Sequence, residues 1–397
     1  MNINNFLIAA TIFTLLQCGS TVTAAQDAAT APSANVPKVS REFIAPSLTT
    51  KLEQNFPADS KPRNIILIIG DGMGQGSLDL ASLEAHSDTR RLVMQQLPVA
   101  GLSTTHSRSS SVTDSAAAAT AIASGIKVDN GNIGVSHEGA VLKSFAERAR
   151  DAGKSVGIIT TDSLAGGTPA PFFAHQINRK MTPEIIADSA TSKFDILVGN
   201  SDTRSLFTSN NVKDNVRNIQ MEMENSGYTF VSSPEEFLAV PAGGKVVAQI
   251  NPDTLSGEET MLSKITVSGI DKLASNEDGF LLVIESWLPD KHGHGNNAEG
   301  TILGVLQTDW VAKVAAEYAA SKGDTLVICT ADHETGAVSA VMSVAEGSIP
   351  VVHYASLAHT GAPVPIYSYG PGAEKLSGVI DNTDIANTIN SLWGLAD

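Results

Sequence analysis

Cysteine is nearly absent from this sequence, with only Cys18 and Cys329 in a chain of 397 residues. If the first 25 residues are removed, Cys329 is left alone and no intramolecular disulfide can form. Cys329 stands in the apolar run 325–329, so we expect a small buried strand residue there rather than a catalytic thiol. The fold must therefore rest on its apolar core, for which 42% hydrophobic residues are sufficient.

Basic residues are also scarce: 26 Lys and Arg stand against 42 Asp and Glu, and the formal net charge is −16. Nucleic-acid phosphates attract basic patches, and none is visible, so we expect no nucleic-acid partner. No run beyond the N-terminus reaches the length of a membrane span. Part of the acidic excess is available for metal binding, where divalent cations would offset it.

The N-terminus predicts a signal peptide at residues 1–25. The apolar run 6–16 is too short to span a bilayer, and the small residues 19–25 suit cleavage by signal peptidase. Residues 1–5 contain no Lys or Arg, which departs from the usual pattern. Cys18 hints at a lipid anchor, but the bulky Gln17 before it favours ordinary secretion, with a periplasmic or secreted protein as the result.

The rest of the chain predicts an α/β fold. Residues 26–60, rich in Ala, Pro, Ser and Thr, predict a loosely ordered segment leading into a domain at 61–397. The apolar run 64–69 predicts a strand buried on both faces, and similar runs recur at 155–160, 280–285 and 325–330. Helical patterns lie between them, for example at 141–152 and 303–321. We expect a doubly wound, mostly parallel sheet with helices on both faces and a small crown-like insertion at about 201–278, beside the sheet.

Polar residues able to bind metals follow three of these predicted strands. They are Asp71 after the first, acidic and imidazole groups between 285 and 294 after the third, and residues 332–334 after the fourth. In open α/β sheets, ligands bind beyond the carboxyl ends of the strands. One Asp there is more often a turn or cap residue, but several together favour a metal site. Asp and His suit Zn²⁺, and harder oxygen ligands suit Mg²⁺.

Ser115 precedes the Ala-rich segment 116–121, which predicts a helix ending near Gly125. The free amides and dipole of its first turn favour a phosphate or an alkoxide, so Ser115 is a candidate nucleophile. From these residues alone, a plain helix cap by Asp114 or Ser115 is the more common explanation.

Several motifs in combination resemble the alkaline phosphatase family and stand in that family's order. They are GDGMG at 70–74, TDSA at 113–116, TPA at 168–170 with His175 and Arg179, Glu285 with Asp290 and His294, TADH at 330–333, and HTG at 359–361. The resemblance extends from about residue 62 to 393. It implies an enzyme that hydrolyses small-molecule phosphate monoesters to an alcohol and inorganic phosphate through a phosphoserine on Ser115.

The resemblance further implies two zinc ions and one magnesium ion. The ligands of one zinc would be Asp290, His294 and His359. Those of the other would be Asp71, Asp332 and His333, with Ser115 as a further ligand. Magnesium would be bound by Asp71, Thr168 and Glu285. Arg179 would clamp two phosphate oxygens, because its planar fork matches them in a way that Lys does not. A metal would also lower the pKa of the Ser115 hydroxyl, a poor nucleophile otherwise.

Three features depart from the family pattern. Members commonly carry Asp or His two residues before the magnesium-binding Thr, where this chain has Gly166, followed by Gly167. Lys291 matches a position where some bacterial members pair a Lys with that Asp; without its partner, we expect it to bind phosphate directly or through water. The short spacing from His333 to His359 indicates a reduced insertion over the family's dimer interface, so monomer and homodimer both stay open.

Other polar residues are expected to have supporting roles. On a helix, His175 would share a face with Arg179, four residues later, and support it rather than bind metal. We expect no ligand role for Glu334 or for the remaining histidines near the motifs, and Trp287 is expected to pack beside the cleft.

Two other functions compete with phosphomonoester hydrolysis. A phosphodiesterase, phosphate-transferring mutase or sulfatase would share the metal-bound superfamily fold, but Arg179 would claim oxygens that a diester substitutes. A non-catalytic phosphate-binding protein would need Arg179 and the helix amides without the full set of metal ligands. Assays with a monoester, a diester and a sulfate ester separate these alternatives.

Overall fold

The computed structural model describes residues 45–57, 59–86, 91–251, 261–341 and 351–395. The predicted signal peptide and the first part of the segment 26–60 lie outside the described residues. All described residues belong to one compact unit, Lys38–Asp397. Among them, no helix combines the length and the apolar character that a membrane crossing requires.

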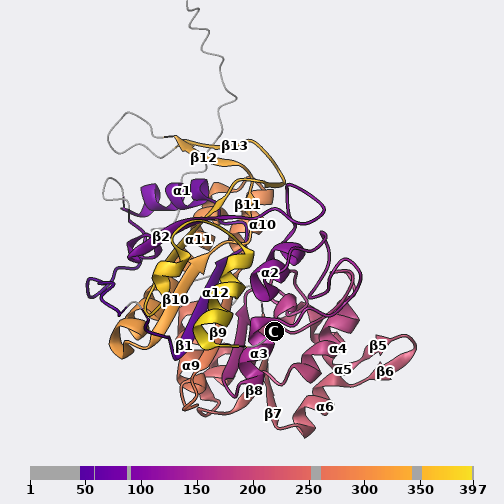
Figure 1. Cartoon of the computed structure of the whole chain (residues 1–397). Coiled ribbons are helices and arrows are strands. Elements are labelled where there is room, and N and C mark those ends of the chain that lie inside the picture. The colour runs from indigo at the N-terminus through magenta and orange to yellow at the C-terminus, as the bar shows by residue number, and fades with distance from the viewer. Residues whose placement is uncertain (1–44, 58, 87–90, 252–260, 342–350, 396–397) are drawn as a thin grey trace, which may run out of the picture. The chain divides into compact units, whose positions relative to one another are not determined.

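A ten-stranded sheet forms the centre of this unit (Figure 1). All neighbouring strands are parallel except β15, which runs antiparallel to both of its neighbours. This confirms the predicted mostly parallel sheet. In spatial order the strands are β16 (Gly378–Asp381), β2 (Val99–Thr104), β15 (Val364–Tyr369), β10 (Thr325–Thr330), β1 (Asn64–Gly70), β9 (Phe280–Ser286), β3 (Ser155–Thr160), β4 (Ile196–Asn200), β8 (Lys245–Ile250) and β7 (Tyr228–Val231).

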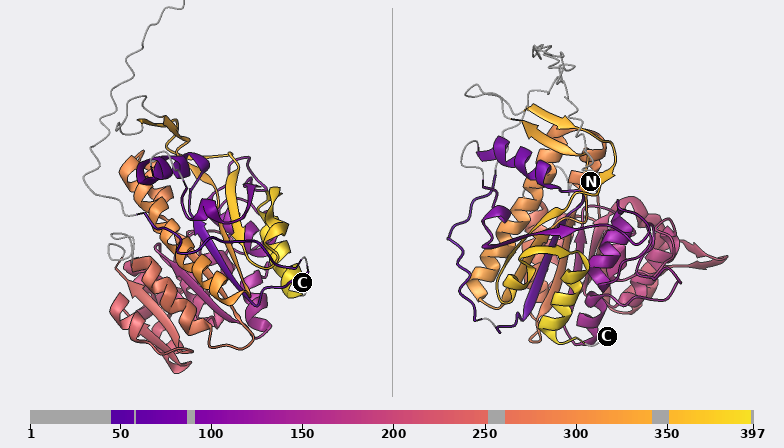
Figure 2. Two further views of the ribbon diagram at one scale, coloured as in Figure 1. Left: turned by 90° about the vertical axis from the view of Figure 1, so that its left-hand side faces the viewer. Right: turned by 45° about the horizontal axis from the view of Figure 1, so that its top comes forward.

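Helices cover both faces of the sheet, as Figure 2 shows. Alternate side chains of β1 point to opposite faces, so Ile66 and Ile68 enter one apolar core while Ile65 and Leu67 enter the other. The first core is completed by α1 (Gln75–His86), α9 (Met261–Leu273) and α11 (Ala298–Lys322). The second is completed by α2 (Ser115–Ser124), α3 (Phe145–Asp151), α4 (Thr182–Ser192) and α12 (Thr383–Trp393). Burial of each large aliphatic side chain contributes about 1.5–3 kcal/mol, which explains why β1 consists of apolar residues on both faces.

The helix boundaries follow capping residues more closely than the apolar pattern alone. The helix expected at 141–152 begins at Phe145, because Ser144 and Glu147 form a reciprocal capping box before it. The helix expected at 303–321 begins earlier, where the Asn297 side chain accepts a hydrogen bond from the Gly300 amide. Helix α2 ends at Gly125 as predicted, with φ of 79° in the left-handed region that glycine readily adopts.

The segment expected as an insertion at about 201–278 is joined to the sheet more closely than the sequence indicated. Its strands β8 and β7 extend the central sheet at one edge, in parallel with β4. The rest of it contains η4 (Ser201–Thr203), α5 (Arg204–Thr208), the hairpin of β5 (Asn210–Val212) and β6 (Asn215–Arg217), α6 (Ile219–Asn225) and α7 (Pro234–Ala239), besides α9.

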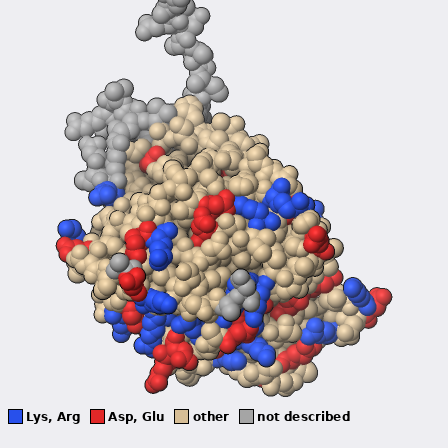
Figure 3. Space-filling model, viewed as in Figure 1, with Lys and Arg blue, Asp and Glu red and all other residues tan. Residues whose placement is uncertain are grey.

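The remaining short elements lie between these. They are η2 (Met94–Gln96), η3 (Ala170–Phe172), α10 (Leu288–His294), the pairs β11 (Glu334–Thr335) with β14 (His359–Thr360) and β12 (Val338–Val341) with β13 (Val351–Tyr354), and η5 (Ala373–Leu376). On the face drawn in Figure 3, Lys and Arg side chains lie among Asp and Glu side chains.

Candidate active site

Four neighbouring strands end at one edge of the sheet and bring the predicted site together. Ile69 of β1 pairs with Thr330 of β10 on one side and with Glu285 of β9 on the other, and Glu285 pairs in turn with Thr160 of β3. The residues that follow these strand ends therefore emerge at the same level. This is the edge at which open α/β sheets bind ligands.

Asp71, Asp332 and His333 form a buried cluster at this edge. One potential ligand atom from each lies within 4.8 Å of the others. Nε2 of His333 is 3.4 Å from Oδ1 of Asp71 and 3.2 Å from Oδ2 of Asp332. Two carboxylates and an imidazole converging on one point form a donor set that suits zinc.

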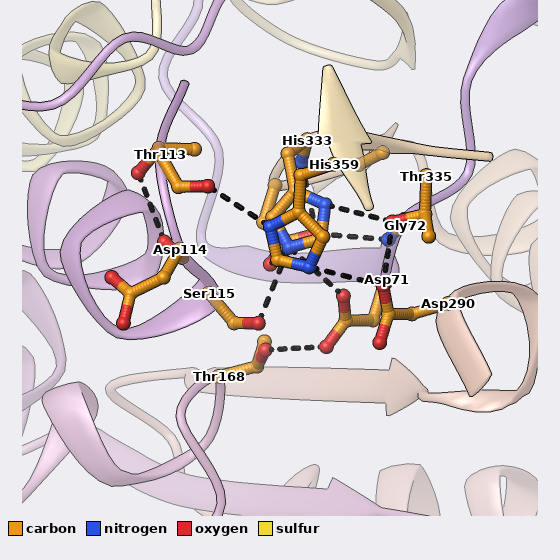
Figure 4. A network of polar contacts seen from close by, with 12 residues as sticks. Asp71, Gly72, Thr113, Asp114, Ser115, Thr168, Asp290, His333, Thr335 and His359 are labelled. Atoms are coloured by element: carbon orange, nitrogen blue, oxygen red, sulfur yellow. Dashed lines mark hydrogen bonds and ion pairs between the residues drawn. The ribbon is translucent and has the colours of Figure 1, made fainter. Parts of the chain in front are cut away.

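A second cluster contains Asp290, His294 and His359, and its ligand atoms also lie within 4.8 Å of one another. Both imidazoles direct Nε2 to Oδ1 of Asp290, at 3.4 Å each. Strand β14, which carries His359, is held beside β11, and the His359 ring stacks on the His333 ring at a centroid distance of 3.5 Å (Figure 4). The two clusters therefore adjoin, as a two-metal site requires.

The other ring nitrogen of each imidazole has a partner that fixes its orientation. Nδ1 of His359 donates to the Thr113 carbonyl at 2.9 Å, and Nδ1 of His294 donates to the Leu357 carbonyl at 2.7 Å. The Thr335 hydroxyl donates to Asp290 at 2.5 Å and lies 3.2 Å from Nδ1 of His333, from which it can accept. Because each Nδ1 faces an acceptor, each Nε2 keeps its lone pair for a metal. Sequence reasoning missed Thr335, whose only signal was its place two residues after a ligand candidate.

Gly72 allows the loop after β1 to approach these groups. Its φ is 68°, and a Cβ there would lie 2.7 Å from Cα of Asp290 and 2.6 Å from Oγ1 of Thr335. Any side chain at this position would push apart the segments that carry Asp71 and Asp290.

Thr168 and Glu285 form a third polar group around Asp71. The Thr168 hydroxyl donates to Oδ2 of Asp71 at 3.0 Å, and the Thr160 hydroxyl donates to Oε2 of Glu285. Three buried carboxylate oxygens in the site have no hydrogen-bond partner among the described residues: Oδ1 of Asp71, Oε1 of Glu285 and Oδ2 of Asp332. Buried orphan oxygens are costly, and divalent cations would satisfy them. The residues present therefore fit bound metals.

Electrostatics support the same conclusion. Burial raises the pKa of Glu285 to about 8, and the charge of Asp162 adds to the shift. Burial, with the charges of Asp332 and Asp290, also raises the pKa of Asp71. Burial opposes ionisation of Asp290 as well, but its hydrogen bond to His359 and nearby imidazole charge lower its pKa to about 2. Cations at this edge would relieve the repulsion among the carboxylates.

Ser115 is the first residue of α2 and lies against the first cluster. Its Oγ is 3.2 Å from Nε2 of His333 (Figure 4). Oδ1 of Asp114 accepts from the amides of Ala117 and Gly131, so Asp114 caps the helix and leaves the Ser115 hydroxyl facing the clusters. The capping explanation thus applies to Asp114 and not to Ser115.

Arg179 contacts the second carboxylate oxygen of Asp114. Its Nη1 is 3.1 Å from Oδ2 of Asp114, and a Cβ on Gly167 would lie 2.6 Å from its Nη2. The guanidinium is therefore packed against the Gly167 backbone, close to the residue before Ser115. The segment from 175 to 181 is not helical, so the helical relation of His175 to Arg179 does not form. His175 instead bonds Oε1 of Glu147 at 3.1 Å and the Gly134 carbonyl at 2.8 Å, a supporting role.

Lys291 lies on α10 next to Asp290 and is exposed. Its Nζ stands 4.5 Å from the centre of the Trp287 ring, which gives Trp287 a place beside the site. Glu334 accepts from the amides of Ala337 and Val338 and orders the loop after the site.

The position of Gly166 holds a carboxylate that sequence reasoning did not anticipate. A Cβ on Gly166 would lie 2.2 Å from Oδ2 of Asp162, so the Asp162 side chain fills the space that a residue at 166 would use. Burial raises the pKa of Asp162 to about 6. The signal was available: Asp162 follows the end of β3, as Asp71 follows β1.

Comparisons with known proteins agree with this geometry. The family model "Alkaline phosphatase" matches residues 62–353. Alkaline phosphatase 4 of Bacillus subtilis is 30% identical, with 85% of this chain and 92% of that protein covered. Streptomycin-6-phosphate phosphatase of Streptomyces griseus is 27% identical, with 89% and 94% covered.

Solved structures of alkaline phosphatases are also similar to this chain. The alkaline phosphatase of the Antarctic bacterium TAB5 superposes with a TM-score of 0.76 at 28% identity, covering 85% of this chain and all of that one (100%). A mutant of the TAB5 enzyme with Mg bound in its M3 site superposes with a TM-score of 0.75 at the same 28% identity, covering 85% and 99%.

Proposed function

The chain belongs to the alkaline phosphatase family of phosphoric monoester hydrolases, and on that premise we propose that Ser115 is its nucleophile and becomes a phosphoserine during turnover. The observation that carries the proposal is the position of Ser115 Oγ, 3.2 Å from Nε2 of His333 at the start of α2. A phosphorus atom bonded to this oxygen would lie between the clusters and the first turn of the helix, where amides and dipole favour negative charge.

The family is metal-dependent, and the three polar groups support the following set of ions. Zinc would be held in one site by Asp290, His294 and His359, and in the other by Asp71, Asp332 and His333 together with Ser115. Magnesium would be held by Asp71, Thr168 and Glu285. When bound, such cations lower the pKa of a coordinated hydroxyl and stabilise charge on phosphate oxygens.

The chain's own residues bind and orient the substrate. Arg179, which contacts Asp114 and Gly167, would bind two non-bridging phosphate oxygens through its planar fork. Lys291, next to Asp290 on α10, would contribute a second positive charge near the phosphate, directly or through water. Attack by the Ser115 alkoxide forms the Oγ–P bond and breaks the bond from phosphorus to the alcohol oxygen. Attack by water then breaks the Oγ–P bond and restores Ser115.

Arg179 also argues for monoesters over diesters. A diester carries an organic group on one of the oxygens that the guanidinium would bind. The complex of Arg179 with a diester would therefore have one hydrogen bond fewer. We further propose export to the periplasm or the medium and leave monomer and homodimer to measurement of mass in solution.

Trapping of the phosphoenzyme tests the proposal. Rapid acid quench after mixing with a labelled monoester should place the label on Ser115. Ser115→Ala should retain zinc, bind phosphate and carry no label, while some metal-assisted hydrolysis survives, as other sites retain part of their catalysis without the nucleophile. Label on any residue other than Ser115 would refute the assignment. A wild-type preference for diester or sulfate ester would refute the monoester specificity.

A further inference from the structure

Asp162 stands where the family pattern places a side chain and where the glycine of this chain would leave an empty space. The sequence has glycine at 166, and Oδ2 of Asp162 lies 2.2 Å from the point that a Cβ at 166 would occupy. The carbonyl of Ser163 is 2.9 Å from the same point, so the space is closed to any side chain. Gly166 is therefore a steric requirement of Asp162 and not simply a lost contact.

Hydrogen bonds tie Asp162 to the magnesium group. Its amide donates to Oγ1 of Thr160 at 2.8 Å, and the same hydroxyl donates to Oε2 of Glu285. Its carbonyl accepts from the amide of Asn200 at 2.8 Å, which anchors it to β4. Oδ2 of the side chain lies against Gly166, two residues before Thr168, and the Asp162 charge contributes to the raised pKa of Glu285. Asp162 is thus fixed between Thr160, whose hydroxyl bonds Glu285, and Gly166 in the turn that leads to Thr168.

A hard cation at this place needs more than the three protein ligands assigned to it. Mg²⁺ is octahedral and usually keeps several waters, whose hydrogens need acceptors. A carboxylate just beyond the ligands is the usual acceptor, and it restrains both the water and the ligand beside it. Of the carboxylates that meet Glu285 here, Asp71 and Asp332 are already assigned as metal ligands, whereas Asp162 is not.

We propose that Asp162 is a positioning residue of the magnesium site, which accepts hydrogen bonds from metal-bound water and thereby replaces the side chain absent at 166. This inference rests on the third metal site of the proposed function. In this chain the carboxylate that holds metal-bound water would come from just after β3, six residues before Thr168. The family pattern places the corresponding side chain two residues before that Thr.

The alternative task for Asp162 is to position Arg179, whose positive charge also reaches it. The two tasks predict different measurements. A water-holding carboxylate controls magnesium affinity, whereas a partner of Arg179 controls phosphate affinity.

Magnesium binding by purified zinc-loaded protein is the test, measured by titration calorimetry with MgCl₂ and without substrate. Asp162→Asn should weaken magnesium binding about 10- to 100-fold, because loss of such outer contacts typically has this effect. Zinc content by elemental analysis should be unchanged, and saturating Mg²⁺ should restore turnover. Asp202→Asn, an exposed neighbouring carboxylate, is the matched control and should bind magnesium like the wild type.

A rescue experiment separates position from general acidity. Gly166→Asp alone should destabilise the protein or weaken magnesium binding, since its side chain would overlap Oδ2 of Asp162. Combined with Asp162→Ala, the same Gly166→Asp change should recover most of the magnesium affinity that Asp162→Ala loses. A helix-rich circular dichroism spectrum and a cooperative melt would verify that each variant is folded.

Each outcome decides the proposal. Magnesium affinity of Asp162→Asn within threefold of wild type would overturn it, as would a change confined to phosphate inhibition, which would assign Asp162 to Arg179. Equal loss of zinc and magnesium would also overturn it, because that indicates collapse of the whole edge. A wild-type protein without measurable magnesium binding would refute the third metal site itself, and so the proposed function fails there separately from Asp162.

Discussion

Asp114 performs two tasks with different oxygens, and Asp114→Asn should separate them. Oδ1 accepts from the amides of Ala117 and Gly131, and Oδ2 pairs with Nη1 of Arg179 at 3.1 Å. Asparagine retains the first oxygen and places an NH₂ group where the second was. The helix cap is therefore preserved, because Asn and Asp cap helices almost equally well, while the hold on Arg179 is lost.

The expected size of the effect on phosphate binding follows from how the Asp114–Arg179 ion pair orders the Arg179 side chain. The Arg179 side chain is 36% exposed and that of Asp114 22%, so the ion pair itself contributes little to stability. Its larger effect is to order a flexible side chain before phosphate arrives, and ordering one such side chain on binding costs about 0.5–1.5 kcal/mol. In Asp114→Asn this cost falls on phosphate binding, which should weaken roughly two- to tenfold.

Inhibition of monoester hydrolysis by inorganic phosphate is the assay. The inhibition constant of Asp114→Asn should rise by that factor, and turnover should hold or increase if phosphate release limits the rate. Asp114→Ala should show the same kinetic change together with a loss of about 1 kcal/mol of stability from the missing cap. In an Arg179→Ala background, Asp114→Asn should have no further effect on phosphate, since both changes remove one interaction. Tighter phosphate binding by Asp114→Asn would refute the reasoning, because it would show that Asp114 competes with phosphate for the guanidinium.

Two further predictions concern stability. Removal of metal by a chelator should lower the melting temperature of the wild type. Asp71→Asn should melt below the wild type with metals present but above it in chelator, because the amide removes one of the buried charges that repel each other. The same order of melting temperatures in both conditions would contradict this prediction. The second prediction concerns the pH dependence of stability. Burial opposes the positive charge of His175, but the interaction with Glu147 outweighs burial, so the pKa of His175 is raised and the pKa of Glu147 is lowered. The ion pair therefore stabilises fully between about pH 5 and 6.5, and the stabilisation is lost as the pH rises through the raised pKa of His175. His175→Gln should cost roughly 1.5–3 kcal/mol at pH 6 and clearly less at pH 9 in parallel melts; equal losses at both pH values would show that the charge is irrelevant.

The fold was predictable from the sequence because its central strands are buried on both faces. A run such as residues 64–69 has no polar side to place in water, so it requires helices above and below and a parallel arrangement. The segment 201–278 was less predictable. Its strands β7 and β8 come after a run of short elements such as α5 and β5, and nothing local indicates that β8 joins the sheet edge beside β4.

The candidate site likewise contains residues that the sequence could indicate and residues that it could not. The groups around Asp71 and Asp290 could be proposed from the resemblance to a known family, whose motifs carry these ligands in the same order, and the structure brings them together. Asp162 follows a strand end that the sequence indicated, but its task and that of Thr335 depend on which side chains lie across the sheet edge, and their own neighbours in sequence do not show this. Glycine at 166 reads as an absence in the sequence, yet in three dimensions it makes room for a carboxylate from another turn of the chain. A missing side chain in a motif therefore becomes informative only when the residue that fills its space is known.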